Sequence, residues 1–265
     1  MSYNFLEKEM REREIYAEIK VSPPFVVRID GRGFRRALAS LNFKKPYDER
    51  FARAMADSAD TFFREGGMNP LLAFIFSDEI NLFFYEIPFN KRIEKIDSII
   101  PSFFSSALTI KLNLKNPISF DARVIPLAKE DIYRYLMWRQ AETWRNHVSS
   151  YGFYTLLKEG LTENEAALRL KNMRSSSVHE LVFQHGINLS NTPAWQRRGI
   201  LVYKETYEKS GYDPVKKIQV KTHRTRIKQE WNAPIFRTEE GQKFVENLIA
   251  CHLKRNANSR ASASL

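Results

Sequence analysis

The pattern of apolar and polar positions predicts an alternation of buried strands and amphipathic helices. Short runs rich in β-branched and aromatic residues lie at 25–29, 71–76 and 80–85, and each is typical of a strand. Between the first two runs, apolar residues recur every three or four positions over 48–64, which predicts a helix with one buried face. The order is therefore a strand, a helix and a returning antiparallel pair.

The remaining elements follow from the same spacing rules. Residues 4–20 form an amphipathic pattern in which Phe5, Ile15 and Ile19 are expected to be buried. Thr162 and Glu165 form a capping box that predicts the start of a helix. We expect helices over 91–106, over 129–150 with a break at Gly152, and over 163–172; strands over 107–114, 120–127 and 199–206; a loop over 175–177; and a disordered tail from Asn256.

Composition indicates a folded protein and excludes several classes. An apolar fraction of 43%, with 13% aromatic residues, is enough for a real core. No apolar run approaches the roughly 20 residues needed to cross a membrane, and the acidic, broken N-terminus lacks the pattern of a secretion signal. The single Cys251 excludes an internal disulfide and a cysteine-rich zinc site. We therefore expect a cytoplasmic protein of the α+β class.

The first predicted strand ends in a carboxylate followed by glycines. Phe25–Ile29 leads directly into Asp30-Gly31-Arg32-Gly33. Glycine lets the backbone approach a ligand closely and turn with positive φ, so Asp30 is placed to meet a metal or a phosphate. An Asp-Gly turn without a ligand fits the same residues.

A second acidic group separates the next two predicted strands. Ser77-Asp78-Glu79 lies between their apolar runs, which predicts a hairpin with acids at its tip. If the strands share one sheet, Asp30 and Asp78 meet at one end, and close carboxylates repel each other unless a cation lies between them. Mg²⁺ suits this arrangement because it takes oxygen ligands and leaves room for phosphates. A pair of such ions ~4 Å apart promotes in-line attack on phosphorus. Asp121 fits either a third metal ligand or a structural turn or salt bridge.

The charge balance favours a polyanionic partner. The chain has 42 Lys and Arg against 31 Asp and Glu, a net charge of +11. The surplus is dense over 216–228, which contains six cations and no acid. An extended strand would place Arg224, Arg226 and Lys228 on one face. That face fits either contact with an RNA backbone or protection of an exposed strand edge from aggregation.

Several motifs occur along the chain in a fixed order. They are Arg28-Ile-Asp30-Gly31, Asn42-Phe43-Lys44-Lys45-Pro46 with Asp48 and Arg50, Ser77-Asp78-Glu79, Phe120-Asp121-Ala-Arg123-Val124, Trp138-Arg139-Gln140-Ala141, Ile187-Asn188 and Arg197-Arg198-Gly199. Together they resemble the histidine-tRNA guanylyltransferase family, and most closely its guanylyltransferase-like members, which are 3′-to-5′ polymerases. The resemblance covers roughly residues 3–206.

The resemblance implies a fold and a division into parts. Residues 1–128 would form a palm-like catalytic domain, as in polymerases and cyclases, with an antiparallel sheet flanked by helices. Residues 129–255 would form a C-terminal helical and β-ribbon portion for RNA binding and assembly, and residues 256–265 the disordered tail. Members of the family usually assemble as homodimers or homotetramers.

The resemblance also implies roles for site residues. Asp30 and Asp78 would bind two Mg²⁺ ions with the Gly31 carbonyl as a further ligand, and Glu79 would support the catalytic site. Nucleotide would be bound by Asp30, Gly31, Arg32, Gly33, Phe34, Arg35, Lys45, Ser77, Asp78, Arg92 and Lys95, and RNA by Arg197 and Arg198. Arg224, Arg226 and Lys228 lie beyond the resemblance and are candidate RNA contacts from their charge pattern alone. Arg35 departs from the histidine of many relatives, and it would not shuttle protons near neutral pH.

The implied reaction adds nucleotides to the 5′ end of tRNA. A 5′ end that carries a triphosphate, or that ATP has adenylylated, is attacked by the 3′ hydroxyl of GTP or another nucleoside triphosphate.

Two other functions fit the residues. A palm with two carboxylates also suits a nucleotide cyclase, which would react with nucleotide alone. A non-catalytic RNA-binding protein would bind no magnesium through Asp30 and Asp78.

Two positions indicate which tRNA is chosen. Trp144 stands where members specific for histidine tRNA have a histidine, and Val178 stands where the family usually has a lysine. Neither side chain makes the polar contacts that read an anticodon, and each bidentate contact to a base contributes ~1–3 kcal/mol of discrimination. The sequence therefore favours a 5′-end repair enzyme that recognises the tRNA elbow and acceptor end.

Overall fold

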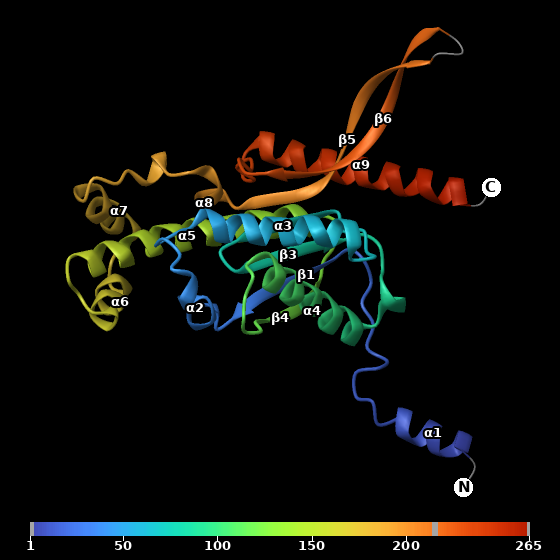
Figure 1. Ribbon diagram of the computed structural model, residues 1–265, viewed down its shortest axis with the longest axis horizontal. Coiled ribbons are helices and arrows are strands. Elements are labelled where there is room, and N and C mark those ends of the chain that lie inside the picture. Colours follow the sequence, from blue (N-terminus) through green and yellow to red (C-terminus); the bar gives the residue numbers. More distant parts are fainter. Residues whose placement is uncertain (1–2, 214–216, 264–265) are drawn as a thin grey trace.

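A six-stranded sheet lies at the centre of the computed structural model, which describes residues 3–213 and 217–263. Every neighbouring pair of strands is antiparallel, in the order β4-β1-β3-β2-β5-β6 (Figure 1). The strands are β1 (Phe25–Arg32), β2 (Leu72–Phe76), β3 (Glu79–Phe84), β4 (Ser119–Pro126), β5 (Ile200–Asp213) and β6 (Ile218–Glu230). The predicted α+β class, with an antiparallel sheet flanked by helices, is confirmed.

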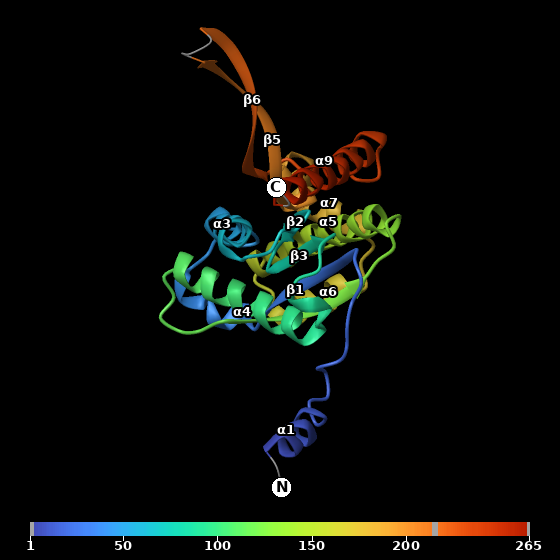
Figure 2. The same ribbon diagram turned by 90° about the vertical axis from the view of Figure 1, so that its right-hand side faces the viewer.

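Helices α3 and α4 cover one face of the sheet, and α5 and α9 cover the other (Figure 2). The helices in chain order are α1 (Tyr3–Arg11), α2 (Phe34–Ala37), α3 (Glu49–Glu65), α4 (Ile93–Lys111), α5 (Asp131–Lys158), α6 (Glu163–Lys171), α7 (Ser175–Gln184), α8 (Ala194–Arg198) and α9 (Glu239–Ala263), with 3₁₀ turns at Ala39–Leu41, Phe89–Lys91 and Leu189–Asn191. The predicted helix over 48–64 is confirmed as α3, and Asp48 caps it by accepting a hydrogen bond from the Arg50 backbone N–H.

Alternation along β1 separates two hydrophobic cores. Phe25, Val27 and Ile29 pack with α3 and α4 on one face of the sheet. Val26 lies on the other face, in the core that β2 and β3 share with α5 and α9. The polar residues of β1, Arg28 and Asp30, follow Val26 at spacings of two and therefore point toward the α5 side. This face carries the candidate site.

The strand register brings the predicted acids to one end of the sheet. Phe76 pairs with Glu79 across the β2–β3 hairpin, and Glu79 also pairs with Asp30 of β1. Asp78 lies in the two-residue turn that precedes Glu79. The hairpin predicted around Ser77-Asp78-Glu79 is therefore confirmed.

The long helix α5 differs from the prediction because it is unbroken at Gly152. A Cβ atom at position 152 would lie 2.6 Å from Val178 Cγ1 of α7 and 3.0 Å from Leu170 Cδ2 of α6. Glycine is needed here for close helix packing rather than for a bend. The capping box of Thr162 and Glu165 is present at the start of α6, as predicted.

The N-terminal segment also differs from the prediction. Helix α1 ends at Arg11 instead of continuing to residue 20, and none of its residues is buried. Phe5 is 56% exposed and Ile15 is 81% exposed, so these predicted core positions are wrong, and Ile19 is exposed as well. The segment extends away from the sheet (Figure 1), and hydrogen bonds between Ile19–Val21 and Lys91–Ile93 join its end to the start of α4.

Three further predictions are corrected. The strand expected over 107–114 is the end of α4, because Ala107 and Leu108 continue the buried stripe of that helix. The loop expected over 175–177 is the first turn of α7. The tail expected to be disordered from Asn256 is helical as far as Ala263, and Asn69 Nδ2 donates a hydrogen bond of 2.9 Å to Asn256 Oδ1.

Strands β5 and β6 belong to the predicted C-terminal portion, residues 129–255. They nevertheless complete the sheet that β1–β4 of the predicted N-terminal portion, residues 1–128, begin. Residues Ile200–Tyr203 of β5 pair with β2. Beyond them, β5 and β6 project as a two-stranded ribbon (Figure 1, orange). Lys216, from the predicted basic segment, lies outside the described residues. Within the described ranges no helix has the length and apolar character required to span a lipid bilayer.

Candidate active site

Two tight turns meet at the end of the sheet. The Gly31 backbone N–H donates a hydrogen bond of 3.2 Å to the Asp78 carbonyl. Ser77 adopts a φ of 50°, in the left-handed region that is strained for a residue other than glycine. The Ser77 hydroxyl donates to Asp78 Oδ1 at 3.0 Å. The backbone hydrogen bond therefore fixes the end of β1 against the turn between β2 and β3.

The carboxyl groups of Asp30 and Asp78 interact electrostatically. Burial raises the pKa of Asp30, and the charge of Asp121 raises it further, whereas Arg123 and Arg28 oppose the increase. Burial also raises the pKa of Asp78, and the charge of Asp30 adds to this effect. Two carboxylates whose ionised forms are disfavoured in this way create a site where a cation is stabilised. Asp121 is exposed and lies opposite Asp30 in the sheet, so both of its predicted roles stay open.

The residues present fit the magnesium ions implied by the resemblance. Mg²⁺ is commonly held by one or two carboxylates, with water and substrate phosphates completing its coordination. Asp30 and Asp78 supply such carboxylates. Among residues 3–213 and 217–263, no three His, Cys, Asp or Glu side chains converge as a self-sufficient metal site. The donor set therefore matches a metal that shares its ligands with a substrate.

Glu79 occupies a different environment from the two aspartates. Both of its oxygens accept hydrogen bonds from Arg139 of α5, and Oε1 also accepts one from Asn81 Nδ2 at 2.7 Å. Burial raises its pKa, whereas Asn81 and Arg139 act in the opposite direction. The carboxylate of Glu79 is therefore held by Arg139 and Asn81, and its role in catalysis stays a prediction.

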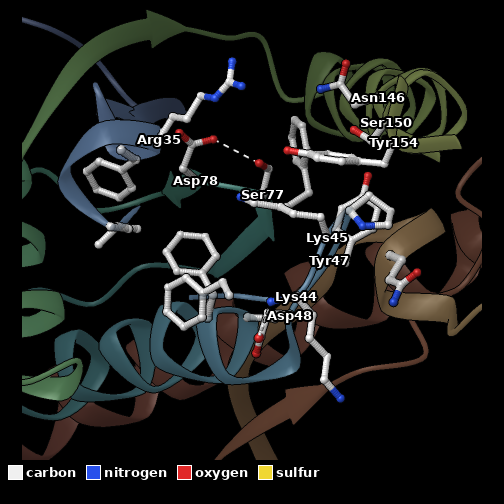
Figure 3. Close-up of a pocket in the computed structure, with 18 of the residues that line it drawn as sticks. Arg35, Lys44, Lys45, Tyr47, Asp48, Ser77, Asp78, Asn146, Ser150 and Tyr154 are labelled. Atoms are coloured by element: carbon white, nitrogen blue, oxygen red, sulfur yellow. Dashed lines mark hydrogen bonds between the residues drawn. The ribbon is translucent and has the colours of Figure 1, made fainter. Parts of the chain in front are cut away.

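A cavity of about 740 Å³ opens beside Ser77 and Asp78 (Figure 3). Its size falls within the roughly 300–1,000 Å³ that is usual for small-molecule sites. The predicted residues Phe34, Arg35 and Lys45 line it together with Ser77 and Asp78. Aromatic and polar side chains complete the walls, namely Tyr47, Trp195, Asn146, Ser150 and Tyr154.

The loop that carries Lys45 is anchored by Asp48. The carboxylate of Asp48 accepts hydrogen bonds of 2.8 Å from the Lys44 and Arg50 backbone N–H groups, and the Arg50 side chain pairs with it at 2.7 Å. Hydrogen bonding from Arg50 is the main cause that holds the pKa of Asp48 well below its usual range. Lys45 lies with its ammonium 6.0 Å from the Tyr154 ring centroid, at the cavity wall.

A second, smaller cavity of about 340 Å³ lies on the other side of the acids. It shares Phe76, Ser77, Asp78 and Asn146 with the larger cavity. Its remaining walls carry charges of both signs, from Arg28, Asp30, Glu79, Arg123, Arg139 and Glu142. The two cavities therefore meet at Ser77 and Asp78, where both can contribute to one reaction.

Some predicted nucleotide contacts are not brought to these cavities. Arg32, Gly33, Arg92 and Lys95 line neither of them. Arg92 instead forms an ion pair with Glu94, and Lys95 is exposed on α4. Gly31 lies beside the acids through its hydrogen bond to Asp78 rather than in a cavity wall.

The predicted RNA contacts form two separate groups. Arg197 and Arg198 lie on α8 next to α5, and Arg197 Nε donates to the Thr192 carbonyl at 2.9 Å. Arg224, Arg226 and Lys228 share one face of the ribbon, as predicted. That face is not free of acids, because Glu205 of β5 pairs with Arg226 at 2.6 Å and with Lys228 at 3.2 Å.

Several residues of the site were missed from the sequence. Arg28, Arg123 and Arg139 were noticed only as parts of motifs, although they surround the smaller cavity. Asn146, Ser150 and Tyr154 were not singled out. Their spacing of four places them on one face of α5, and this polar stripe on a largely buried helix is the signal that would have identified them.

Comparison with known proteins decides the family. The family described as tRNAHis guanylyltransferase matches residues 7–128, and the Thg1 C terminal domain matches residues 130–240. The chain belongs to the tRNAHis guanylyltransferase family. The family predicted from the motifs is therefore confirmed, and the two matches together span most of the chain.

Individual relatives support the assignment. The probable tRNA(His) guanylyltransferase of Drosophila melanogaster is 32% identical over 191 residues, 68% of this chain and 66% of that protein. The chain thus spans about two thirds of the length of that relative. The probable tRNA(His) guanylyltransferase of Dictyostelium discoideum is 33% identical over 219 residues, 75% of this chain and 83% of that protein.

Solved structures of the tRNAHis guanylyltransferase family share the fold. The enzyme from Saccharomyces cerevisiae has a TM-score of 0.64 at 30% identity, over 76% of this chain and 92% of that one. Bacterial Thg1-like proteins in complex with ATP and with GTP give TM-scores of 0.68 and 0.66, at 23% and 22% identity, and cover 98% and 99% of their chains and 92% and 93% of this one. The family fold therefore includes the β5–β6 portion as well as the palm.

Proposed function

We propose that this chain is a nucleotidyltransferase that extends the 5′ end of tRNA in the 3′-to-5′ direction. The observation that carries the proposal is a pair of carboxylates: Asp78 lies where the two cavities meet, and Asp30 lies in the wall of the smaller one. Membership of the family supports it, since relatives are described as tRNA(His) guanylyltransferases. Nucleotide complexes of bacterial Thg1-like proteins support binding of ATP and GTP.

Asp30, Asp78 and the Gly31 carbonyl would hold two Mg²⁺ ions. When bound, such ions polarise phosphoryl oxygens and favour ionisation of the attacking hydroxyl. The raised pKa of each aspartate is reversed by a neighbouring cation, because the cation stabilises the ionised carboxylate. Ser77 orients Asp78 through its hydrogen bond.

The larger cavity would receive a nucleoside triphosphate. Arg35 and Lys45 supply positive charge at its wall, and Tyr47, Tyr154 and Trp195 supply aromatic surface for a base. Positive charge at the cavity wall lowers the activation barrier of phosphoryl transfer, because the transition state spreads negative charge over the phosphoryl oxygens. The arginines of the smaller cavity would balance the negative charge of the activated phosphate at the 5′ end of the tRNA.

The proposed reaction joins these two cavities. The 3′ hydroxyl of the incoming nucleotide attacks the α-phosphorus of the activated 5′ end, and a new O–P bond forms. Pyrophosphate leaves if the end carries a triphosphate, and AMP leaves if ATP has adenylylated it. The hydroxyl proton passes to solvent or to the leaving group.

We propose that the enzyme is of the 5′-end repair type and does not read the anticodon. Trp144 stacks on His147 with ring centroids 5.5 Å apart. Val178 is 5% exposed and packs in the same helical cluster. Both side chains pack in the cluster that α5 and α7 share, and neither supplies the imidazole or the ammonium group expected at these positions.

The decisive experiment incubates the protein with tRNAs that lack their first 5′ nucleotide. The anticodon and the base opposite the missing nucleotide are varied independently, with magnesium and all four nucleoside triphosphates present. Addition should follow the opposing base and be insensitive to the anticodon. Exclusive use of the histidine anticodon, or addition of guanosine opposite every base, would contradict the repair assignment. A reaction without RNA that cyclises nucleotide would instead support a cyclase.

We further propose a cytoplasmic homodimer or homotetramer, as the family resemblance implies. Light scattering coupled to size-exclusion chromatography measures the assembly state directly. A monomeric mass at micromolar concentration would contradict this part of the proposal.

A further inference from the structure

Glu79 is bound by an arginine, although it belongs to the same stretch as Asp78 and lines the same small cavity as Asp30 and Asp78. It follows Asp78 directly and lies opposite Asp30 in the register of β1 and β3. Arg139 donates to both of its oxygens, through Nε to Oε1 at 3.0 Å and through Nη2 to Oε2 at 2.6 Å. Only 6% of the Arg139 side chain and 12% of the Glu79 side chain are exposed.

The surroundings fix this ion pair. The Arg139 guanidinium lies 4.5 Å from the Trp138 ring centroid and 5.2 Å from that of Phe76. Asn81 donates to Glu79 Oε1 and in turn accepts a hydrogen bond of 2.8 Å from the Tyr135 hydroxyl. A two-point guanidinium–carboxylate contact of this kind is directional and resists rotation of the carboxylate.

We propose that Arg139 is a positioning residue that withholds Glu79 from the divalent-metal site, so that the Glu79 carboxylate does not join those of Asp30 and Asp78 as a ligand. The inference rests on the proposed function, because it takes these two aspartates as metal ligands. The carboxylate of Glu79 would occupy a position that a substrate phosphate needs. It would also favour Ca²⁺, which accepts six to eight oxygen ligands, over the octahedral Mg²⁺.

Loss of Arg139 should change the metal affinity in the opposite direction from loss of a metal ligand. Removal of Arg139 frees Glu79 to join the site, so metal binding becomes tighter while nucleotide addition becomes slower. A merely structural role for Arg139 would weaken both. The direction of the change in metal affinity therefore distinguishes the two roles.

The test measures Ca²⁺ and Mn²⁺ binding by titration calorimetry on the full-length protein without nucleotide. Asp78→Asn should weaken binding, which establishes the site, and Glu79→Gln should leave the affinity within about twofold of wild type. Arg139→Met should tighten Ca²⁺ binding by about tenfold, in keeping with the effect of ligand charge on affinity. The double variant Arg139→Met, Glu79→Gln should return to the wild-type affinity, because the freed carboxylate is gone.

Two further outcomes separate this inference from the proposed function. If Asp78→Asn does not change metal binding, the metal site itself is elsewhere and both proposals fail. If Asp78→Asn weakens binding but Glu79→Gln weakens it equally, Glu79 is already a ligand and only this inference fails. A folded Arg139→Met with unchanged or weaker Ca²⁺ binding overturns it as well.

Because Arg139→Met leaves a buried carboxylate unpaired, Arg139→Lys is measured in parallel, with folding checked by near-ultraviolet circular dichroism. Glu79→Gln is isosteric and decides the question if both arginine variants misfold.

Discussion

Arg35 of α2 forms an ion pair with Glu163, the first residue of α6, across the wall of the larger cavity. The partners are 128 positions apart and come from the palm and from the helical portion. Both side chains are more than half exposed, so the pair is weak, and exposed pairs contribute about 0–1 kcal/mol. A nucleotide phosphate therefore competes effectively with Glu163 for Arg35.

Replacement of Glu163 by glutamine should tighten nucleotide binding. The substitution frees Arg35 for phosphate without removing it, and the expected gain is at most about fivefold, the equivalent of ~1 kcal/mol. Arg35→Ala should weaken binding in the same assay, for example fluorescence titration with a labelled GTP analogue. Glu159→Gln, which lies near α6 but outside the cavity wall, serves as the matched control. Weaker binding by Glu163→Gln would contradict the competition.

Asp30→Ala and Asp78→Ala should each abolish nucleotide addition and leave the fold intact. Loss of one carboxylate removes a metal ligand, and the expected decrease is about a thousandfold or more in rate, equivalent to at least ~4 kcal/mol of transition-state stabilisation. Single-turnover assays with a 5′-triphosphorylated tRNA measure the chemical step. Near-normal rates in a well-folded variant would remove that residue from the metal site.

Asp78→Asn should stabilise the metal-free protein at neutral pH. The raised pKa of Asp78 means that the folded state binds the proton more tightly than the unfolded state does. Stability from this group is therefore lost as the pH rises through the folded pKa, and the asparagine variant avoids the loss. Thermal unfolding should show an increase of about 2–4 °C in Tm for each kcal/mol gained. The difference should vanish below the ordinary aspartate pKa, and Mg²⁺ should stabilise the wild type more than the variant.

His252→Phe should reduce the sensitivity of stability to mild acid. Burial is the main cause that lowers the pKa of His252, as of His147, from 6.5 to about 4. Unfolding then takes up a proton at each site between these values, so stability falls as the pH drops through this window, by up to about 3 kcal/mol per histidine. Urea unfolding at several pH values measures the slope. Asp30 and Asp78, whose pKa values are raised, change the stability with pH in the opposite direction, but they do so equally in the wild type and the variant. The difference between the two slopes therefore reports on His252 alone. An unchanged slope would contradict a lowered pKa for His252.

The ribbon cations should contribute unequally to tRNA binding. Among the described residues, Arg224 has no ion-pair partner, whereas Arg226 and Lys228 share Glu205. Replacement of all three by alanine should weaken binding and reduce the slope of log K against log salt by up to ~0.9 for each phosphate that is no longer neutralised. Arg224→Ala alone should account for most of the change. Lys111→Ala, at the end of α4, is the control, and an unchanged slope would favour protection of the strand edge.

Local patterns predicted the N-terminal half of the fold well. The strand before Asp30, the hairpin at Ser77-Asp78-Glu79 and the helix α3 each combine a clear period with a strong turn or cap. The errors occur where tertiary packing decides. Gly152 resembles a helix breaker in the sequence, but it lies in α5 because Val178 packs against it.

Charge pairing across long sequence distances could not be predicted in the same way. Alternation placed Arg224, Arg226 and Lys228 on one face, but the register that brings Glu205 opposite Arg226 depends on where β5 and β6 pair. The contact between Arg139 and Glu79 likewise joins residues 60 positions apart. Motif order identified the family and the acids, whereas the environment of each acid required the structure.

The continuity of β5 has a structural consequence. Its first residues, Ile200–Tyr203, are hydrogen-bonded to β2, and the same strand continues to Asp213 in the ribbon. At about 3.3 Å per residue, the projecting part reaches roughly 30 Å from the sheet. Ile200, the first residue of the same strand, lines the larger cavity together with Ser77 and Asp78. One uninterrupted strand therefore links the wall of that cavity to the far end of the ribbon.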